Sequence, residues 1–159
     1  MSMAQNRILS LDIRQTDKQY VITPKLVFQT SKEIKEAIDN GIRLYLIVKA
    51  EIYQPNSWWF DKTLAQQKIE LEISYSSLLK LYQVKNKQSK EQLGFNTYEE
   101  LWQGFANLAI IKFSKNNSQG HQLKVRVVLD KGALPTAMQL PVLFNSSWAI
   151  NTKWYSHAL

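Results

Sequence analysis

Few side chains in this sequence could carry out catalysis. The sequence contains two histidines and no cysteine, which excludes a thiol nucleophile and a thiolate metal site. His121 follows a run of turn-forming residues and His157 lies close to the C-terminus, and both positions are typical of exposed side chains. The sequence has no His-Glu-x-x-His motif and no glycine-rich phosphate loop. We therefore expect no catalytic residue, no cofactor and no metal ligand, and we predict that the protein is not an enzyme.

Two acidic pairs could be mistaken for catalytic carboxylates. Glu70 and Glu72 lie two residues apart in a predicted strand, so their side chains share one face with Lys68. This arrangement is more typical of a solvated sheet face than of a general acid and its base. Glu99 and Glu100 stand at the start of a predicted helix, where capping and the helix dipole favour acids. Neither pair predicts an acid–base site.

A cluster of large aromatic residues is the least ordinary feature of the sequence. It follows Pro55 and consists of Trp58, Trp59, Phe60 and Asp61. Three consecutive aromatic side chains cannot all point into the core, so at least one should be exposed. In one interpretation, two of the aromatics cover the core and Asp61 caps a turn or a helix. In the other, the four residues form a partner surface, because tryptophan offers a large contact area and loses little entropy on binding.

Basic residues are in excess, with a formal net charge of +7. Such a charge favours acidic proteins, nucleic acids or lipid head groups as partners. The densest basic stretch comprises Lys80, Lys85, Lys87 and Lys90. Glu91 interrupts it, which is typical of a solvated face. A single-stranded nucleic-acid site would combine the aromatic cluster with Lys49, Lys62 and Lys68, but no RNA-binding signature accompanies them, so we expect no nucleic-acid partner.

Alternating apolar and polar residues predict three half-buried strands, at residues 42–52, 65–75 and 123–129. One side of each is apolar and the other polar, which is typical of antiparallel sheets. The alternation in residues 9–28 predicts a β-hairpin whose first strand turns Leu9, Leu11 and Ile13 to one face. Pro24 lies inside the second strand of this hairpin, so we expect that strand to be bulged or at a sheet edge.

Two short helices are predicted between the strands. Thr30 and Glu33 have the spacing of a capping box, and Gly41 can end the helix that they begin. A second box at Thr97 and Glu100 precedes an apolar helical stripe. Weaker patterns predict strands at residues 79–84 and 109–113, a polar loop or hairpin turn at 85–91, and a last strand or extended edge segment at 148–154.

These elements predict a mainly β (α+β) fold. We expect an antiparallel β-sandwich of about seven strands with two short helices in the connections. A single curved sheet with both helices on one face is the alternative. The chain has no internal repeat or flexible linker, so we predict a single domain over residues 1–159. A domain of this size buries about 70% of the surface of its unfolded chain, enough to fold without disulfides.

Several segments, taken in order, resemble the bacterial family of unknown function DUF4390. They are residues 58–61, Leu71 with Tyr75 and Leu78, Tyr82 with Val84, Phe95 before the second helix, Leu129-Asp130 with Leu134-Pro135, and Trp148 with Trp154. The first helix, in which Glu36-Ala37 runs into Gly41, is also similar to the family pattern. The resemblance spans nearly the whole chain and depends on order and spacing. The family has no established activity, so the resemblance implies no catalytic residues.

The resemblance also implies a location. Members of the family usually carry an N-terminal export signal, whereas Met1 to Ser10 lack the basic and then apolar pattern of one. We therefore expect a periplasmic or otherwise exported protein whose signal was removed, with a cytoplasmic protein as the alternative. No stretch approaches the ~18 apolar residues of a membrane span, so no transmembrane segment is expected.

Three functions are compatible with these patterns. The first is a non-enzymatic, envelope-associated interaction domain that contacts another envelope protein through a sheet edge or through residues 58–61. The second is a carrier of a small apolar ligand, which requires a closed cavity of several hundred Å³ between the sheet and the helix of Trp102. The third is binding of single-stranded nucleic acid. We expect the first function, and the sequence leaves the oligomeric state open.

Overall fold

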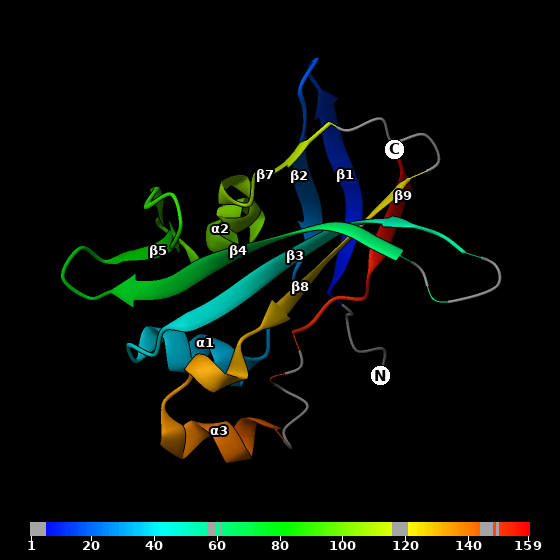
Figure 1. Ribbon diagram of the computed structural model, residues 1–159. Helices are drawn as coiled ribbons and strands as arrows, with labels where there is room; N and C mark the ends of the chain where they lie inside the picture. Colours follow the sequence, from blue (N-terminus) through cyan, green and yellow to red (C-terminus); the bar gives the residue numbers. More distant parts are fainter. Residues whose placement is uncertain (1–5, 57–59, 61, 116–120, 144–147, 149) are drawn as a thin grey trace.

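The structure is a computed structural model that describes residues 6–56, 60, 62–115, 121–143, 148 and 150–159. Over these residues the fold is mainly β, with two antiparallel sheets and three α-helices (Figure 1). The larger sheet has the order β6-β5-β4-β3-β8-β9 and the smaller sheet the order β1-β2-β7. The strands are β1 (Arg7–Gln15), β2 (Gln19–Val27), β3 (Leu44–Gln54), β4 (Lys62–Ser76), β5 (Leu81–Asn86), β6 (Gln92–Phe95), β7 (Ile111–Ser114), β8 (Gln122–Leu129) and β9 (Tyr155–Ala158). This architecture confirms the predicted fold class.

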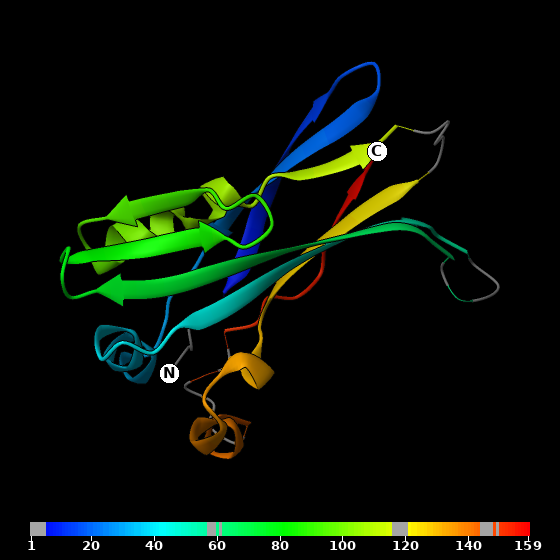
Figure 2. The ribbon, with the colours of Figure 1, turned by 60° about the vertical axis from the view of Figure 1, so that its left-hand side comes forward.

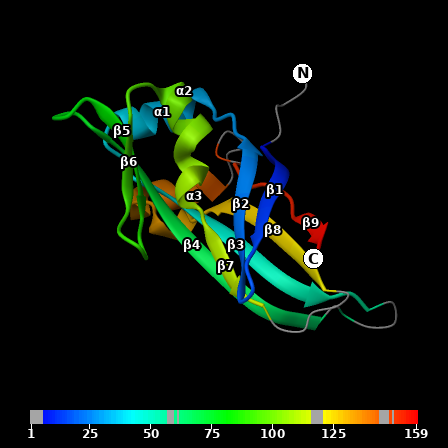
Figure 3. The same cartoon turned by 90° about the horizontal axis from the view of Figure 1, so that it is seen from above.

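The hydrophobic core lies between the two sheets and continues beneath the helices. The alternation predicted for residues 42–52, 65–75 and 123–129 is confirmed, because their apolar side is turned inward in β3, β4 and β8. The smaller sheet lies across the larger one, as Figures 2 and 3 show. Its outer strands reach the larger sheet, since β7 contacts β4 and β1 contacts β9. The arrangement is therefore sandwich-like, as expected.

Helix α1 (Lys32–Asp39) begins one residue later than the sequence pattern predicted. Its N-cap is Ser31, whose hydroxyl accepts a hydrogen bond from the Ile34 N–H at 3.3 Å. Thr30, the predicted cap, instead hydrogen-bonds the hydroxyl of Tyr98. The predicted role of Gly41 is confirmed, because its φ of 93° lies in the left-handed region that favours glycine.

Helix α2 (Tyr98–Gly104) confirms the second predicted capping box. The Thr97 hydroxyl accepts from the Glu100 N–H at 3.1 Å, and the Glu100 carboxylate accepts from the Asn96 N–H at 3.2 Å. A 3₁₀ turn, η1 (Phe105–Leu108), continues the helix. The Trp102 ring stacks on Phe28 with centroids 5.1 Å apart. The helix is therefore fixed to the end of β2 by aromatic contact.

The β1–β2 hairpin departs from simple alternation at Leu9. The pairing register shifts between Ile8 and Ser10, so Ile8 points inward and Leu9 is 48% exposed. The prediction that Leu9 shares the face of Leu11 is therefore wrong, because a bulge inserts an extra residue and reverses the parity. Pro24 was expected at a bulge or a sheet edge. Since β7 pairs only with residues 19–22 of β2, Pro24 has no neighbouring strand on that side, as at a sheet edge.

Two elements were not predicted from the sequence. Strand β6 pairs with β5 by only four residues, which is too short for an alternation pattern to be visible. Helix α3 (Thr136–Leu143) contains Pro141 and follows the 3₁₀ turn η2 (Lys131–Ala133). Pro135 before it and Pro141 within it weaken the helical signal of the sequence, because proline removes a helical hydrogen bond. Within the described parts of the chain, no helix has the length and apolar character needed to cross a membrane.

The C-terminal segment runs beside β8, and its regular strand begins later than residues 148–154. Trp148, Ile150 and Thr152 are buried. The Thr152 hydroxyl accepts from the Val127 N–H at 2.9 Å, in place of a ladder bond. Regular pairing starts at Tyr155, so the strand is β9 and not residues 148–154.

A polar contact joins α1 to β5. The Tyr82 hydroxyl donates to the Asp39 carboxylate at 2.5 Å, and the Lys35 ammonium donates to the same carboxylate at 2.7 Å. Burial and the hydrogen bond to Asp39 raise the pKa of Tyr82 to about 12. Burial alone would raise the pKa of Asp39, but the bonds from Lys35 and Tyr82 outweigh it and lower that pKa. The contact therefore stabilises a neutral tyrosine beside a charged aspartate.

We predict that Tyr82 makes stability depend on alkaline pH. Because folding raises the pKa of Tyr82 above its ordinary value of 10.0, its contribution is complete below pH 10 and is lost as the pH rises toward about 12. Urea unfolding at about pH 9 and about pH 11 should show a smaller loss of stability in Tyr82→Phe than in the wild type. Tyr155→Phe serves as the control and should lose as much stability as the wild type. Equal losses in Tyr82→Phe and the wild type would contradict the prediction.

Candidate functional site on the outer face of the six-stranded sheet

The side of the larger sheet that points away from the core is here called the outer face. On β3 it carries Tyr45, Ile47, Lys49 and Glu51, each between two buried residues. The outward residues of β4, β5 and β8 continue it on either side. These side chains are mostly half-exposed, whereas their inward neighbours on β3 are buried. The outer face is therefore a broad surface with mixed charged, polar and apolar character.

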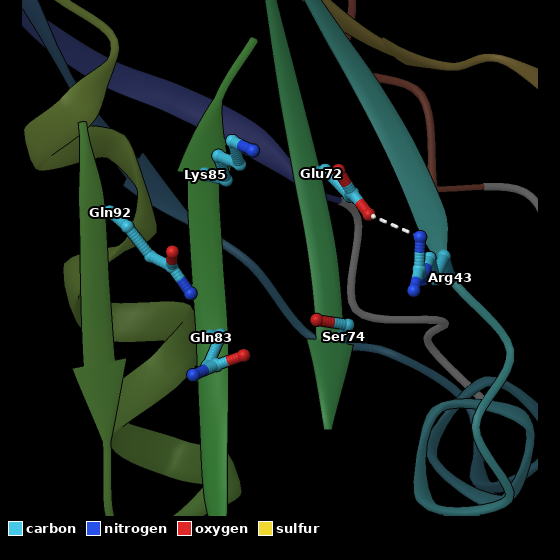
Figure 4. A pocket seen from close by; sticks show the side chains of 6 residues that line it. All are labelled: Arg43, Glu72, Ser74, Gln83, Lys85 and Gln92. Carbon is cyan, nitrogen blue, oxygen red and sulfur yellow. Dashed lines mark ion pairs between the residues drawn. The ribbon is translucent and has the colours of Figure 1, made fainter. Parts of the chain in front are cut away.

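One end of the outer face is hollowed into a polar pocket of about 230 Å³. Figure 4 shows its lining, which comes from β6, β5, β4 and the residue that precedes β3: Gln92, Gln83, Lys85, Glu72, Ser74 and Arg43. Arg43 and Glu72 form an ion pair of 3.4 Å, and the Glu72 side chain is only 17% exposed. This pairing neutralises the carboxylate at the floor of the pocket.

The other glutamates of the outer face are also paired. Glu70 lies 3.2 Å from the Lys87 ammonium, and this hydrogen bond raises the pKa of Lys87. Glu51 lies 3.3 Å from the Lys124 ammonium. Glu70 and Glu72 are therefore matched with different cations. They do not converge on a common point as a catalytic acid and base would.

Three cations of the outer face lie side by side on neighbouring strands. The register places Lys49 of β3 directly opposite Lys68 of β4 and directly opposite Arg126 of β8. No acidic side chain of the described residues forms an ion pair with any of the three. Like charges in directly opposed positions destabilise a sheet. We call Lys68, Lys49 and Arg126 the cation row.

Trp154 closes the cation row at the edge of the sheet. The pairing of Tyr155 with Val125 brings Trp154 next to Arg126. The Arg126 guanidinium lies 5.4 Å and the Lys124 ammonium 4.8 Å from the centre of the Trp154 ring, which is 37% exposed. The buried Nε of Arg126 has no hydrogen-bond acceptor in the described part of the chain. The ring thus holds the guanidinium in place by a cation–π contact.

The predicted partner surface can be placed only in part. Trp58, Trp59 and Asp61 lie outside the described residues, and Phe60 is 95% exposed. Of the lysines that were considered with it, Lys49 and Lys68 come together in the cation row, and Lys62 is exposed at the start of β4.

Sequence reasoning missed Arg126 and Trp154 as members of this surface. Arg126 lies far along the chain from the two lysines, and only the pairing of β8 with β3 brings it beside Lys49. The alternation of apolar and polar residues was the available signal. Arg126 lies between two valines in a clear strand pattern, which places its side chain on the face opposite to theirs.

The histidines lie at the paired ends of β8 and β9. The His121 carbonyl accepts from the Leu159 N–H at 3.1 Å. His157 is exposed, and its Nδ1 lies 2.6 Å from the carbonyl oxygen of Ala158. Over the described ranges, no group of three or more histidine, aspartate or glutamate side chains could hold a metal ion.

A second depression lies beside α2. This groove of about 510 Å³ is lined by residues 26–30 together with Tyr98, Glu99, Trp102 and Gln103. It opens along the surface between the end of β2 and the helix. Beneath it, Trp102 packs against Phe28 and Phe105, with ring centroids 5.1 and 5.3 Å apart. Aromatic rings therefore occupy the space between the helix and the strand.

We predict that the cation row costs the fold stability. In Lys49→Thr the repulsion from Lys68 and Arg126 is removed, so the free energy of unfolding should rise by about 0.5 kcal/mol. Lys112→Thr is the matched control, because Lys112 lies on β7 opposite the uncharged Val21, and it should change little. The free energy of unfolding of both variants is measured by urea unfolding at about 0.01 M and about 1 M salt. The increase in Lys49→Thr should be smaller at high salt, because salt screens the repulsion between the cations. A loss of stability in Lys49→Thr at low salt would contradict the prediction.

Comparison with protein families gives one match that covers nearly the whole chain. The model described as "Domain of unknown function (DUF4390)" matches residues 4–158 of the 159. Curated proteins and solved structures give no match. The match agrees with the resemblance seen in the order and spacing of the sequence segments. The chain therefore belongs to the DUF4390 family.

Proposed function

We propose that this chain is a non-enzymatic domain that acts by binding another protein of the bacterial envelope through its outer face. The observation that carries the proposal is the cation row, in which three like charges are aligned without an acidic partner among the described residues. Each directly opposed pair of like charges destabilises the fold. A partner that supplies acidic groups would remove that cost on binding.

The composition of the surrounding surface supports contact with a protein. The half-exposed apolar side chains of Ile47 and Val128 lie next to the cation row, and the partly exposed ring of Trp154 lies at its end. Tryptophan and arginine are enriched where proteins meet, because both bury a large area and retain polar contacts. Arg126 lies in the paired strand β8 and Trp154 directly precedes β9, so regular strand pairing limits the entropy that both lose on association.

The location in the envelope is part of the proposal and is supported by membership of the family. The possibility that residues 58–61 contact the partner is compatible with it, because they lie in the sequence between β3 and β4, which carry Lys49 and Lys68 of the cation row. Carriage of a small apolar ligand has weaker support, since the groove beside Trp102 is open along the surface and its lining includes Gln29, Glu99 and Gln103.

Site-specific photo-crosslinking in the bacterium that encodes the protein tests the contact. A photoreactive phenylalanine replaces Gln66, which is exposed on the outer face next to Lys68 on the same side of β4. The control position is Lys18, which is exposed in the turn between β1 and β2. We expect a discrete product with another protein from position 66 and none from position 18. Recovery of the monomer alone from both positions, in repeated experiments, would contradict the proposal.

The proposed location has a separate test. The product of the native gene is expected in the periplasmic fraction after osmotic shock of the cells, together with a periplasmic marker enzyme. Its recovery only with a cytoplasmic marker enzyme would show that the envelope part of the proposal is wrong.

A further inference from the structure

We propose that the cation row is a docking site for an acidic segment of a partner protein, whose carboxylates lie across the strands along the row. This inference rests on the proposed function and names the chemistry of the partner. The occupant is chosen by charge complementarity, because Lys68, Lys49 and Arg126 present three positive charges that no acid among the described residues matches.

The spacing of the cation row fits carboxylates on a protein chain. Neighbouring strands lie about 4.8 Å apart, so the three cations span about 10 Å. Acidic side chains three or four residues apart on a helix are separated by about 5–6 Å at their Cβ atoms. Acids two residues apart on an extended chain are separated by about 6.8 Å. Two or three carboxylates of one segment can therefore meet the cations together.

The neighbours of the cation row limit the kind of anion that can bind. Glu70 lies two residues from Lys68 on β4, and Glu51 lies two residues from Lys49 on β3, so acids flank the row on both sides. Both are held in place by ion pairs with lysines. A membrane surface carries anions in every direction and would meet these carboxylates. A protein segment can place its acids on the row and uncharged side chains on either side.

Trp154 favours a protein segment over single-stranded nucleic acid. Binding of single strands depends on exposed aromatic rings on which bases stack. Here Arg126 and Lys124 already lie over the Trp154 ring, so a base could stack there only by displacing them. The same contact holds the guanidinium of Arg126 in a fixed position. A fixed, planar guanidinium loses little entropy when it forms a hydrogen-bonded pair with a carboxylate.

The test measures binding of labelled probes to the whole chain by fluorescence anisotropy. The first probe is a peptide of Asp-Glu-Leu repeats, and the second is its neutral Asn-Gln-Leu counterpart. The third is a single-stranded oligothymidylate of the same charge as the first, and vesicles of anionic phosphatidylglycerol form the fourth. We expect the acidic peptide to bind more tightly than the other three and to weaken as salt screens the charges.

Two matched variants separate the cation row from the overall charge of the protein. The triple variant Lys49→Gln, Lys68→Gln, Arg126→Gln should weaken binding of the acidic peptide roughly tenfold or more. The control variant Lys18→Gln, Lys25→Gln, Lys112→Gln loses the same charge from exposed positions on the smaller sheet and its hairpin turn, and it should leave the Kd within roughly threefold of the wild type. Lys68→Gln alone changes an exposed side chain, so it tests the site if the triple variant fails to fold.

Each outcome decides the inference. The triple variant of Lys49, Lys68 and Arg126 is here called the row variant. If the row variant and the control variant weaken binding of the acidic peptide equally, the inference is overturned, because binding would then depend on net charge alone. Tighter binding of the oligothymidylate or the vesicles, lost in the row variant, would assign the row to another class of partner. If photo-crosslinking yields a partner whose attachment persists in the row variant, the proposed function holds and this inference fails. If no partner is crosslinked at all, the proposed function itself fails.

Discussion

The pairing of β3 with β4 on one side and β8 on the other determines both faces of the molecule. Side chains alternate along each strand, so one register sends Leu46 and Leu71 into the core and aligns Lys49, Lys68 and Arg126 outside. A slip of one residue would exchange the buried and exposed sets of the slipped strand. The apolar core therefore holds the cations next to one another, although their mutual repulsion acts against that register.

This coupling explains how an unfavourable surface can persist. The inward side chains of β3 and β8, with Leu71 and Ile73 of β4, are buried almost completely, and burial of each large apolar side chain contributes about 1.5–3 kcal/mol. Repulsion between opposed lysines is smaller than one such contribution. The three glutamates of the outer face already form ion pairs with Arg43, Lys87 and Lys124. Within the described part of that face, these glutamates therefore compensate other cations than those of the cation row. The three cations of the row therefore remain without an acidic partner among the described residues.

Much of the fold could be predicted from the sequence, because long alternation and capping boxes are local signals. The strands of residues 42–52, 65–75 and 123–129 and the helix after Thr97 follow from such signals. The bulge at Leu9 and the short strand β6 could not be predicted, because both depend on a neighbouring strand. Helix α3 tolerates Pro141, which a local rule places outside helices.

The candidate site was predictable only in its parts. Lys49 and Lys68 could be selected from charge, but their opposition requires the register of β3 and β4. Arg126 joins them through a strand that is distant in the sequence. Trp154 reaches Arg126 because irregular pairing around Thr152 precedes β9. There the Thr152 hydroxyl accepts the Val127 N–H that a backbone carbonyl would accept in a regular sheet, and such a contact leaves no pattern in the sequence.

The irregular residue at Leu9 affects how copies of this protein behave toward one another. A sheet margin recruits further chains when its amide and carbonyl groups are evenly spaced. In β1 the extra residue breaks that spacing, and the charged side chains of Arg7, Asp12 and Arg14 lie along the same strand. Growth of the smaller sheet into a continuous fibril from this margin is therefore disfavoured.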